Sequence, residues 1–320
     1  MNNKIVILSG DPNSINSEII YKSWKKLSID QKKNIFLISN FELLRQQFAI
    51  LKYSVKLIKI KNINDKIITN NLKILDIPLD FDDPFKVTFK TSSIFVKKTL
   101  NLAHDLALNG DVKGIINCPI NKKLLKKKNY GITEYLAAKC KIKNNSEVML
   151  IKNKNFSVLP ITTHINLRDV ARKINLKKII KKILTFNSWF KLNYKRYPRI
   201  GVLGLNPHNA ELEKNSEESK IIVPSIKKLQ KKGLKITGPL VSDTVFINEY
   251  QKYDVIVGMY HDQVLAPFKT IFKFDAINIT LGIKYLRLSP DHGVAENIIK
   301  KKVADHTSLS RCINFLEEYQ

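Results

Sequence analysis

The sequence predicts an α/β fold with a largely parallel sheet and helices on both faces of the sheet. Continuous apolar runs recur along the 320 residues, and segments with helical features lie between them. Such runs are typical of parallel strands, which are buried on both faces. Strands that alternate with helices favour crossover connections and hence parallel pairing. The length and the apolar content of 44% allow two domains or one large α/β unit.

The first part of the chain repeats a unit of strand, loop and helix. Ile5-Val6-Ile7-Leu8 is an apolar run that ends in the loop sequence Ser9-Gly10-Asp11-Pro12, and a helical segment follows. The expected elements are strands at 5–8, 34–39 and 114–117 and helices at 17–27, 41–48 and 93–108.

The second part continues in mixed α/β style. Neighbouring strands are expected at 147–151 and 156–161, because the residues 152–155 between them are turn-like. A helix at 217–232 is expected to end at Gly233. The other expected elements are a long helix at 167–186 and strands at 199–205, 253–258 and 276–280. Because no long linker or repeat occurs, any domain boundary is expected to be compact, and the chain can cross it more than once.

The composition does not favour a nucleic-acid-binding protein, although the formal net charge is +27. Only seven of the 55 basic residues are arginines, and the other 48 are lysines spread along the whole chain. Nucleic-acid recognition favours clustered charge with arginine forks and interleaved aromatic side chains. We therefore expect solvated lysine faces, which still help to gather anionic substrates.

The cysteines and the apolar runs indicate a cytoplasmic location. Cys118, Cys140 and Cys312 are too few and too scattered for a disulfide framework or a thiolate zinc site. No apolar stretch approaches the length of a membrane span, and the N-terminus leads directly into a strand-like run. No membrane partner is therefore expected.

Three histidines each lie in a polar cluster that follows or interrupts an apolar, strand-like run. They are His164, His208 and His261. Ligands of open α/β folds gather at the carboxyl ends of strands, so these imidazoles are well placed for a metal ion or a polar substrate. Three neutral imidazoles also leave coordination positions open, as a catalytic metal requires. Each histidine alone is more often an ordinary polar residue at a strand end, and only the combination favours a metal site.

Eight motifs occur along the chain in the order found in the 4-hydroxythreonine-4-phosphate dehydrogenase family of pyridoxal phosphate biosynthesis. The motifs are Ser9-Gly10-Asp11-Pro12, Cys118-Pro119-Ile120-Asn121-Lys122, Gly131-Ile132-Thr133-Glu134, Thr162-Thr163-His164, Gly204-Leu205-Asn206-Pro207-His208, Gly238-Pro239 with Ser242-Asp243-Thr244, Tyr260-His261-Asp262-Gln263, and Ser289-Pro290-Asp291-His292-Gly293. The chain resembles this family over essentially its whole length.

The resemblance implies a fold like that of isocitrate and isopropylmalate dehydrogenases, with two α/β lobes around a central cleft. The expected lobes are residues 1–128 with 270–320, and residues 129–269 with the dimer interface. A homodimer with shared active sites is implied. The family oxidises 4-phosphohydroxy-L-threonine with NAD or NADP, and the keto product then loses carbon dioxide. This type of dehydrogenase carries no Rossmann fingerprint, and no G-x-G-x-x-G follows a strand here.

The resemblance also implies roles for individual residues. His164, His208 and His261 match the ligands of a divalent metal, for which zinc, cobalt and magnesium are the candidates. Asp243 and Asp262 are candidates for substrate contact or proton transfer, with orientation of the imidazoles as an equal alternative. The expected substrate contacts are Thr133, Lys269, Asn278 and Arg287, and the expected cofactor contacts are His292 and Gly293.

Arg287 also stands out because the chain uses lysine nearly everywhere. An arginine at this position favours a planar fork that binds a phosphate through two hydrogen bonds. The alternative is an arginine in a surface ion pair. For Asp291, which precedes His292, the alternative role is a helix N-cap, and both roles are compatible.

The chain departs from the family pattern in the substrate motif. Family members have Gly-His-Thr-Glu where this chain has Gly131-Ile132-Thr133-Glu134, so an imidazole that contacts the substrate is replaced by an apolar side chain. One polar contact is expected to be lost.

Two loops also depart from the family. Ser14 and Asn16 occupy glycine positions of the first loop, and Asn16 is expected to keep the turn because asparagine tolerates positive φ. Val294, Asn297 and Lys300 replace family residues after His292-Gly293. These later changes leave the nucleotide preference open.

Three interpretations are compatible with these departures. The first is the same reaction with relaxed binding, and the second is a related dehydrogenase that acts on another 4-phosphorylated four-carbon hydroxy acid. The third is a catalytically weak protein kept for a binding role. The three retained histidines disfavour the third interpretation.

Overall fold

The chain crosses twice between two units in the computed structural model, which describes residues 3–65, 69–125, 131–142 and 147–319. The first unit comprises Met1–Ile132 with Lys284–Tyr319, and the second comprises Thr133–Ile283. The expected boundary at 128/129 lies outside the described residues. The expected return at 269/270 differs from the observed one, because β11 (Ile277–Leu281) pairs with β6 (Val148–Lys152) and keeps this segment in the second unit.

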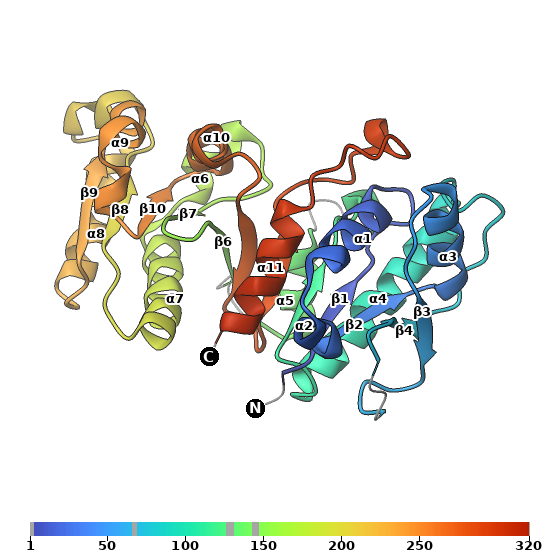
Figure 1. The fold of residues 1–320 in the computed structure, drawn as a ribbon. Helices are drawn as coiled ribbons and strands as arrows, with labels where there is room; N and C mark the ends of the chain where they lie inside the picture. Colours follow the sequence, from blue (N-terminus) through green and yellow to red (C-terminus); the bar gives the residue numbers. More distant parts are fainter. Residues whose placement is uncertain (1–2, 66–68, 126–130, 143–146, 320) are drawn as a thin grey trace. The chain divides into compact units, whose positions relative to one another are not determined.

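The first unit is built on parallel strands, as the apolar runs predict. Its strand order is β3-β4-β2-β1-β5-β12, and neighbouring strands pair in parallel. Helix α4 packs on β1, β2 and β5, whereas α1 contacts α3 and α11 (Figure 1). The strands are β1 (Ile5–Leu8), β2 (Ile35–Ser39), β3 (Leu57–Ile60), β4 (Leu72–Asp76), β5 (Gly114–Asn117) and β12 (Arg287–Pro290). The helical segments are α1 (Asn16–Lys26), α2 (Ile29–Asn34), α3 (Phe41–Ile50), α4 (Phe89–Leu108), η1 (Lys122–Leu125), η6 (Glu296–Ile298) and α11 (Thr307–Glu318).

The second unit mixes parallel and antiparallel pairs. Its strand order is β11-β6-β7-β10-β8-β9, in which β6 is antiparallel to both β11 and β7. The strands not yet named are β7 (Ser157–Pro160), β8 (Ile200–Leu203), β9 (Ile236–Leu240) and β10 (Val255–Gly258). Its helical segments are α5 (Ile132–Lys139, which begins at the boundary), η2 (Leu167–Asp169), α6 (Val170–Lys173), α7 (Leu176–Tyr194), η3 (Pro207–Leu212), η4 (Glu218–Ile222), α8 (Val223–Gln230), α9 (Ser242–Asn248), η5 (Tyr250–Lys252) and α10 (His261–Phe272).

Two sets of helices cover the strands of this unit (Figure 1). Helices α7 and α8 contact each other, and α7 packs on β6 and β11. Helices α9 and α10 bury Val245 and Phe268 in one apolar cluster with side chains of β6, β7, β8 and β10. Burying such side chains stabilises the fold by roughly 1.5–3 kcal/mol each. Helix α10 therefore packs on β7 and β10, which precede it in the chain.

One expected helix is wrong in its extent. Residues 167–186 do not form a single helix, because α6 ends at Lys173 and α7 begins at Leu176. Asn175 has an extended backbone, and its side chain accepts a hydrogen bond from the backbone N–H of Lys178 at 2.9 Å. An N-cap of this kind starts a new helix.

None of the described helices is both long enough and apolar enough to cross a membrane.

Candidate active site

The three predicted metal histidines follow three neighbouring parallel strands, at one edge of the sheet of the second unit. Strand β10 pairs in parallel with β7 on one side and with β8 on the other. His164 follows β7, His261 follows β10, and His208 follows β8. The order β7-β10-β8 therefore places the end of the His261 strand between the ends of the other two.

His164 and His261 lie close together. Their ring centroids are 5.8 Å apart and their ring planes are inclined by 41°. The backbone N–H and the hydroxyl of Thr162 donate to the carbonyl oxygen of Met259 at 3.1 and 2.7 Å. These bonds join the two loops just before the histidines, so the proximity of the rings is built into the sheet edge.

Each of these two rings has a carboxylate beside its Nδ1 atom. Asp262 Oδ1 lies 2.6 Å from Nδ1 of His261, and Glu134 Oε1 lies 3.7 Å from Nδ1 of His164. A carboxylate hydrogen-bonded to one ring nitrogen fixes the tautomer and leaves the other nitrogen as an electron-pair donor. The Nε2 atom of His261 is therefore suited to a metal ion, whereas Nδ1 of His164 is buried with no hydrogen-bond partner among the described residues. This geometry favours the orienting role for Asp262, whose side chain is 83% exposed.

His208 lies in a left-handed turn within η3. The φ angles of His208, Asn209, Ala210 and Glu211 are 49°, 58°, 48° and 45°, and that of Leu212 is 56°. Each non-glycine residue in this region costs roughly 1–2 kcal/mol, because its Cβ approaches the following carbonyl oxygen. Strain of this kind persists only where the surrounding structure fixes the backbone.

The buried carboxylate of Glu218 fixes the start of this turn. Glu218 Oε1 accepts hydrogen bonds from the backbone N–H groups of Leu205 and Asn206 at 2.7 and 2.8 Å. Asn206 Nδ2 donates to Glu218 Oε2 at 3.0 Å. Burial raises the pKa of Glu218, but the hydrogen bonds from Asn206 and Leu205 outweigh it and lower the pKa below its ordinary value. A Cβ on Gly204 would lie 2.1 Å from Asn209 Oδ1 and 3.0 Å from Glu218 Oε1, so a larger residue would displace the Asn209 side chain.

The structure thus brings together two of the three predicted metal ligands. Across the described ranges from 3 to 319, no three His, Cys, Asp or Glu side chains are arranged to hold a metal ion. Glu134 and Glu218 were not predicted as functional residues. Glu134 stands in the quoted motif after Thr133, and its position could have pointed to a role. Glu218 lies ten residues after His208, and no local sequence pattern marks it.

The other predicted residues of the second unit lie on separate elements. Thr133, near the start of α5, is 3.3 Å from Thr280 of β11 through their hydroxyl groups. Asn278 lies two residues earlier on β11, and its Oδ1 is buried with no hydrogen-bond partner among the described residues. Asp243 is exposed in the first turn of α9, and Lys269 is half-buried on α10. The buried amide oxygen of Asn278 fits an expected ligand contact.

Arg287 belongs to the first unit and is a buried residue of β12. It is 2% exposed, and its Nε donates to Asn117 Oδ1 of β5 at 2.6 Å. This burial excludes the alternative of a surface ion pair. A guanidinium held by Nε keeps its terminal amines in a fixed plane, the geometry that a bidentate anion contact needs.

The predicted cofactor residues also belong to the first unit. His292 Nδ1 lies 3.0 Å from the carbonyl oxygen of Gly293, and a Cβ on Gly293 would meet nothing within 4 Å. Downstream, Ala295 and Lys300 have φ angles of 50° and 67°. Lys300 therefore adopts a left-handed conformation that glycine would adopt at lower cost.

The first loop corrects one prediction. Asn16 does not keep a positive-φ turn, because it is the first residue of α1, and neither Ser14 nor Asn16 has positive φ. The Ser14 hydroxyl donates to the carbonyl oxygen of Asp11 at 2.5 Å and accepts from the backbone N–H of Asn16 at 3.2 Å. Gly10, with φ of 75°, makes the turn instead. Its absent Cβ would lie 2.5 Å from the carbonyl oxygen of Pro119.

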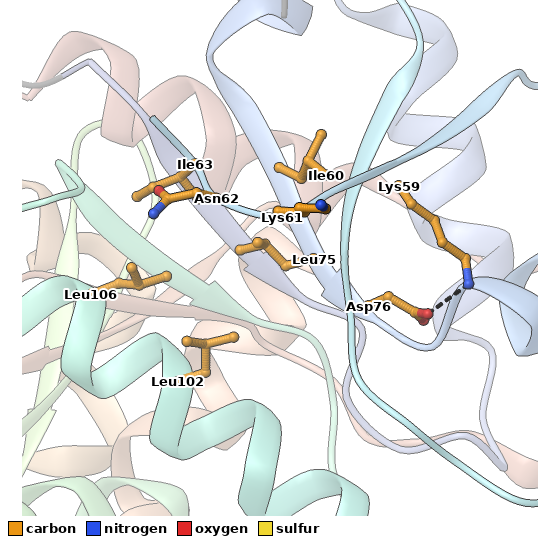
Figure 2. Close-up of a pocket in the computed structure, with 9 residues that line it drawn as sticks. All are labelled: Lys59, Ile60, Lys61, Asn62, Ile63, Leu75, Asp76, Leu102 and Leu106. Carbon is orange, nitrogen blue, oxygen red and sulfur yellow. Dashed lines mark hydrogen bonds and ion pairs between the residues drawn. The ribbon is translucent and has the colours of Figure 1, made fainter. Parts of the chain in front are cut away.

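The first unit also has a pocket, and the residues that line it are separate in the sequence from the predicted site residues. It has a volume of about 610 Å³ and a mainly apolar lining from β3, β4 and α4 that includes Leu75, Leu102 and Leu106 (Figure 2). Lys59 at its rim is paired with Asp76 at 2.8 Å. No predicted site residue lines it, and its chemistry supports no part of the expected reaction.

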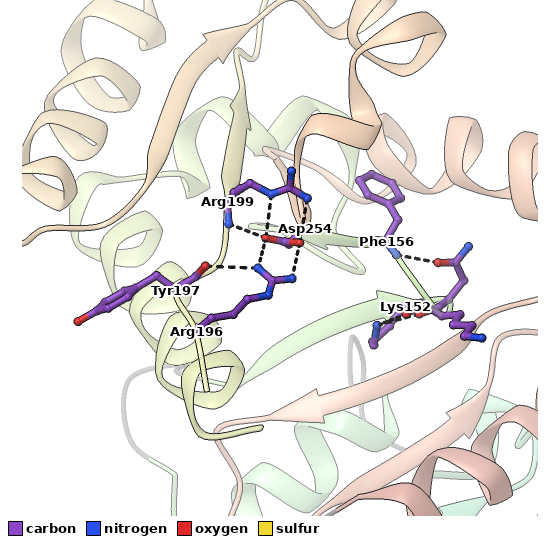
Figure 3. A network of polar contacts seen from close by, with 8 residues as sticks. Lys152, Phe156, Arg196, Tyr197, Arg199 and Asp254 are labelled. Carbon is purple, nitrogen blue, oxygen red and sulfur yellow. Dashed lines mark hydrogen bonds and ion pairs between the residues drawn. The ribbon is translucent and has the colours of Figure 1, made fainter. Parts of the chain in front are cut away.

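A buried aspartate anchors the amino end of β10, the strand that precedes His261. Asp254 directly precedes β10 and accepts two hydrogen bonds from Arg196, at 2.8 and 2.9 Å (Figure 3). The backbone N–H of Arg199, which precedes β8, donates to the same carboxylate at 2.8 Å. Strands β8 and β10 are thus tied together at their amino ends, which fixes their register.

Comparisons with known proteins agree with the resemblance seen in the sequence. The sequence model of the family described as "Pyridoxal phosphate biosynthetic protein PdxA" matches residues 31–316. A 4-hydroxythreonine-4-phosphate dehydrogenase of Sulfurihydrogenibium sp. is 36% identical over 95% of this chain and 94% of that protein. A D-threonate 4-phosphate dehydrogenase of Pectobacterium atrosepticum is 30% identical over 93% of both chains.

Solved structures support the same relationship. The 4-hydroxythreonine-4-phosphate dehydrogenase of Klebsiella pneumoniae has a TM-score of 0.83 at 30% identity, and the match covers 98% of both chains. An isocitrate dehydrogenase of Methylococcus capsulatus has a TM-score of 0.51 at 10% identity over 98% of this chain and 84% of that one, a likeness of fold alone. The predicted isocitrate dehydrogenase-like α/β class is therefore confirmed. The chain belongs to the PdxA family of pyridoxal phosphate biosynthetic proteins.

Proposed function

We propose that this protein is a metal-dependent NAD(P) dehydrogenase that oxidises 4-phosphohydroxy-L-threonine in the biosynthesis of pyridoxine 5′-phosphate. The 3-keto acid phosphate formed would lose carbon dioxide to give 3-amino-2-oxopropyl phosphate. The single observation that carries the proposal is the 5.8 Å approach of the His164 and His261 rings at adjacent parallel strand ends. Family membership supplies the reaction type.

His164, His208 and His261 would hold the divalent cation, with zinc, cobalt and magnesium as candidates. When bound, such a cation would lower the pKa of the substrate hydroxyl and would polarise the ketone that decarboxylates. The residues fit this role, because carboxylates already face the Nδ1 atoms of His164 and His261. Asp262 is then assigned to orienting His261, and Asp243 remains the candidate for proton transfer.

Arg287, Lys269, Asn278 and Thr133 would bind the phosphorylated substrate. Arg287 is held in a fixed plane by Asn117, and Asn278 carries a buried amide oxygen suited to a ligand. His292 and Gly293 would contact NAD or NADP, which accepts the hydride. The open space beside Gly293 is compatible with a close approach of the cofactor.

We further propose a cytoplasmic homodimer with shared active sites. In the second unit, Leu167 and Ile247 are 68% and 67% exposed, and Leu167 lies only three residues after His164. Exposed apolar side chains mark an interface where they form a contiguous patch, so family membership supports the dimer more strongly than these two residues do. All three cysteines are free and buried, in keeping with a reducing compartment. Sedimentation of the full chain tests the dimer.

The first test is metal content. His208→Ala should abolish turnover and reduce bound zinc or cobalt, measured by elemental analysis of the purified protein, because the mutant lacks one of three imidazole ligands. His306→Ala is the control, since that histidine lies in the first unit outside the predicted set. Unchanged metal stoichiometry in His208→Ala would contradict the proposal that His208 is a metal ligand.

A second candidate function is oxidation of another 4-phosphorylated four-carbon hydroxy acid. The observation that favours it is Ile132, which replaces the imidazole of the substrate motif, together with relatives described as D-threonate 4-phosphate dehydrogenases. NADH formation should be compared for 4-phosphohydroxy-L-threonine and D-threonate 4-phosphate, each with and without a chelator. A higher kcat/KM for D-threonate 4-phosphate would establish the second candidate.

Substitution of Ile132 provides a further test of which substrate is used. Ile132→His should lower KM for 4-phosphohydroxy-L-threonine, because the added ring nitrogen can donate a hydrogen bond to the substrate. Ile132→Leu is the matched control for a change of shape without a donor. Loss of activity in Ile132→His but not in Ile132→Leu would favour the alternative substrate.

A further inference from the structure

The side-chain amide of Gln263 joins three segments that carry predicted site residues. Its Nε2 donates to the carbonyl oxygen of Gly204 at 2.7 Å and to the hydroxyl of Ser242 at 2.9 Å. Its Oε1 accepts from the backbone N–H of Met259 at 2.7 Å. Gly204 begins the turn that leads to His208. Ser242 precedes Asp243, and Met259 precedes the helix start that carries His261 and Asp262.

Only a primary amide of this length satisfies all three partners. Both Nε2 hydrogens and one lone pair of Oε1 are used, so the orientation of the amide is fixed. A glutamate would place a carboxylate oxygen against the carbonyl oxygen of Gly204 and would have no hydrogen to donate. A leucine would leave the N–H of Met259 and the carbonyl of Gly204 without these partners, which is costly in a partly buried setting.

The surrounding glycines make room for this arrangement. A Cβ on Gly258 would lie 2.5 Å from Val264 Cγ1 and 3.0 Å from Gln263 Oε1, so a larger residue at the end of β10 would displace these side chains of α10. On the β8 side, Glu218 holds the backbone N–H groups of Leu205 and Asn206. Gln263 therefore connects a rigid turn to a rigid helix start, and its length sets the spacing between them.

We propose that Gln263 is a positioning residue that sets the His208 turn and the start of α9 relative to the His261–Asp262 helix start. It acts through backbone groups and through Ser242, and it does not touch the substrate. The inference rests on the proposed metal function, because a fixed spacing between imidazoles matters when one ion must bind to both. Mutation of the groups that support metal ligands typically lowers metal affinity by about 10–100-fold.

Cobalt alone is the probe, added to metal-stripped full-length protein and followed by its visible absorption and by competition with a chelator. Gln263→Glu and Gln263→Leu should weaken cobalt binding at least about tenfold and change the absorption spectrum. Gln230→Glu is the matched control, because Gln230 Nε2 also donates to a backbone carbonyl, that of Ile236 at 3.1 Å, away from the site. The control should bind cobalt like the unaltered protein.

Ser242→Ala is a milder variant that guards against misfolding, since it removes only one of the three partners. It should weaken cobalt binding by less than Gln263→Leu, and it should have no further effect when combined with Gln263→Leu. Melting temperatures measured without metal separate a local change of geometry from a general loss of stability. Equal cobalt affinity and spectra in all Gln263 and Ser242 variants would overturn the proposal. If His208→Ala also bound cobalt normally, the proposed metal function itself would fail.

Discussion

Replacing Asp254 by asparagine should destabilise the second unit substantially. The carboxylate is 5% exposed, and Arg196 and Arg199 hold it at the start of β10 (Figure 3). Hydrogen bonds to charged groups contribute about 1.5–3 kcal/mol each, but both arginines are half-exposed, so solvent screens much of the attraction. We expect a loss of about 2–3 kcal/mol, because asparagine keeps the shape but turns one acceptor into a donor facing the guanidinium groups.

The pH dependence of this loss has a definite sign. Burial alone raises the pKa of Asp254, but the hydrogen bonds from Arg196 and Arg199 outweigh it and hold the pKa well below the usual range. A carboxylate with a lowered folded-state pKa stabilises the fold above its unfolded-state pKa of about 3.9, and this stabilisation is lost as the pH falls through the folded-state value. The difference between Asp254→Asn and the unaltered protein should therefore be full at pH 7 and should shrink below about pH 4.

Tryptophan fluorescence during urea unfolding can measure the loss of stability in the second unit, which contains Asp254. The chain has two tryptophans, Trp24 on α1 of the first unit and Trp189 on α7 of the second. In a Trp24→Phe background the signal comes from Trp189 alone. Glu249→Gln is the control, because Glu249 is paired with Lys252 at 2.9 Å in the same unit but both side chains are exposed. If Asp254→Asn cost no more unfolding free energy than Glu249→Gln, burial would not be what gives the Asp254 network its strength.

Two further substitutions test strain and burial. Ala210→Gly should raise the free energy of unfolding by about 0.5–1 kcal/mol in the same fluorescence assay, because glycine adopts the φ of 48° without a Cβ clash, and an unchanged value would contradict the strain. Lys73→Met should stabilise the first unit at pH 7, because burial lowers the pKa of Lys73 to about 8 and so penalises its charged form in the folded state. The unaltered protein gains stability as the pH rises from about 8 towards 10.4, so its free energy of unfolding should approach that of Lys73→Met over this range. A constant difference between the two free energies of unfolding would refute burial of the charged form as the cause.

The strands that could be predicted from the sequence are those with continuous apolar runs. Runs such as Ile5–Leu8 and Val255–Gly258 are fully buried, and His261 follows the second of these runs. Strands β3, β4, β9 and β12 were not predicted, and for β3 and β12 the physical reasons are clear. Leu57–Ile60 is partly exposed beside β4, and Arg287–Pro290 buries an arginine and a serine instead of an apolar run. Burial of Arg287 depends on Asn117, which is 170 residues away in the sequence.

The histidine cluster could be predicted in part for a similar reason. Strand ends and polar neighbours pointed to His164 and His261, whose approach follows from the pairing of β7 with β10. Among the polar neighbours, Asp262 contacts the His261 ring directly, whereas Thr162 and Gln263 bond mainly to backbone atoms and join one loop to another. That role depends on contacts far apart in sequence.

The left-handed turn at His208 helps to decide between a metal-dependent enzyme and a protein kept only for a binding role. Five successive residues without glycine adopt positive φ there, and each costs roughly 1–2 kcal/mol. A buried carboxylate, an amide from α10 and the side chain of Asn209, which donates to the carbonyl oxygen of Pro239 at 3.1 Å, hold this backbone in place. A protein kept only for a binding role has no physical need for such strain at one strand end. The turn is better explained by a requirement on the position of the His208 imidazole, which favours the metal-dependent enzyme.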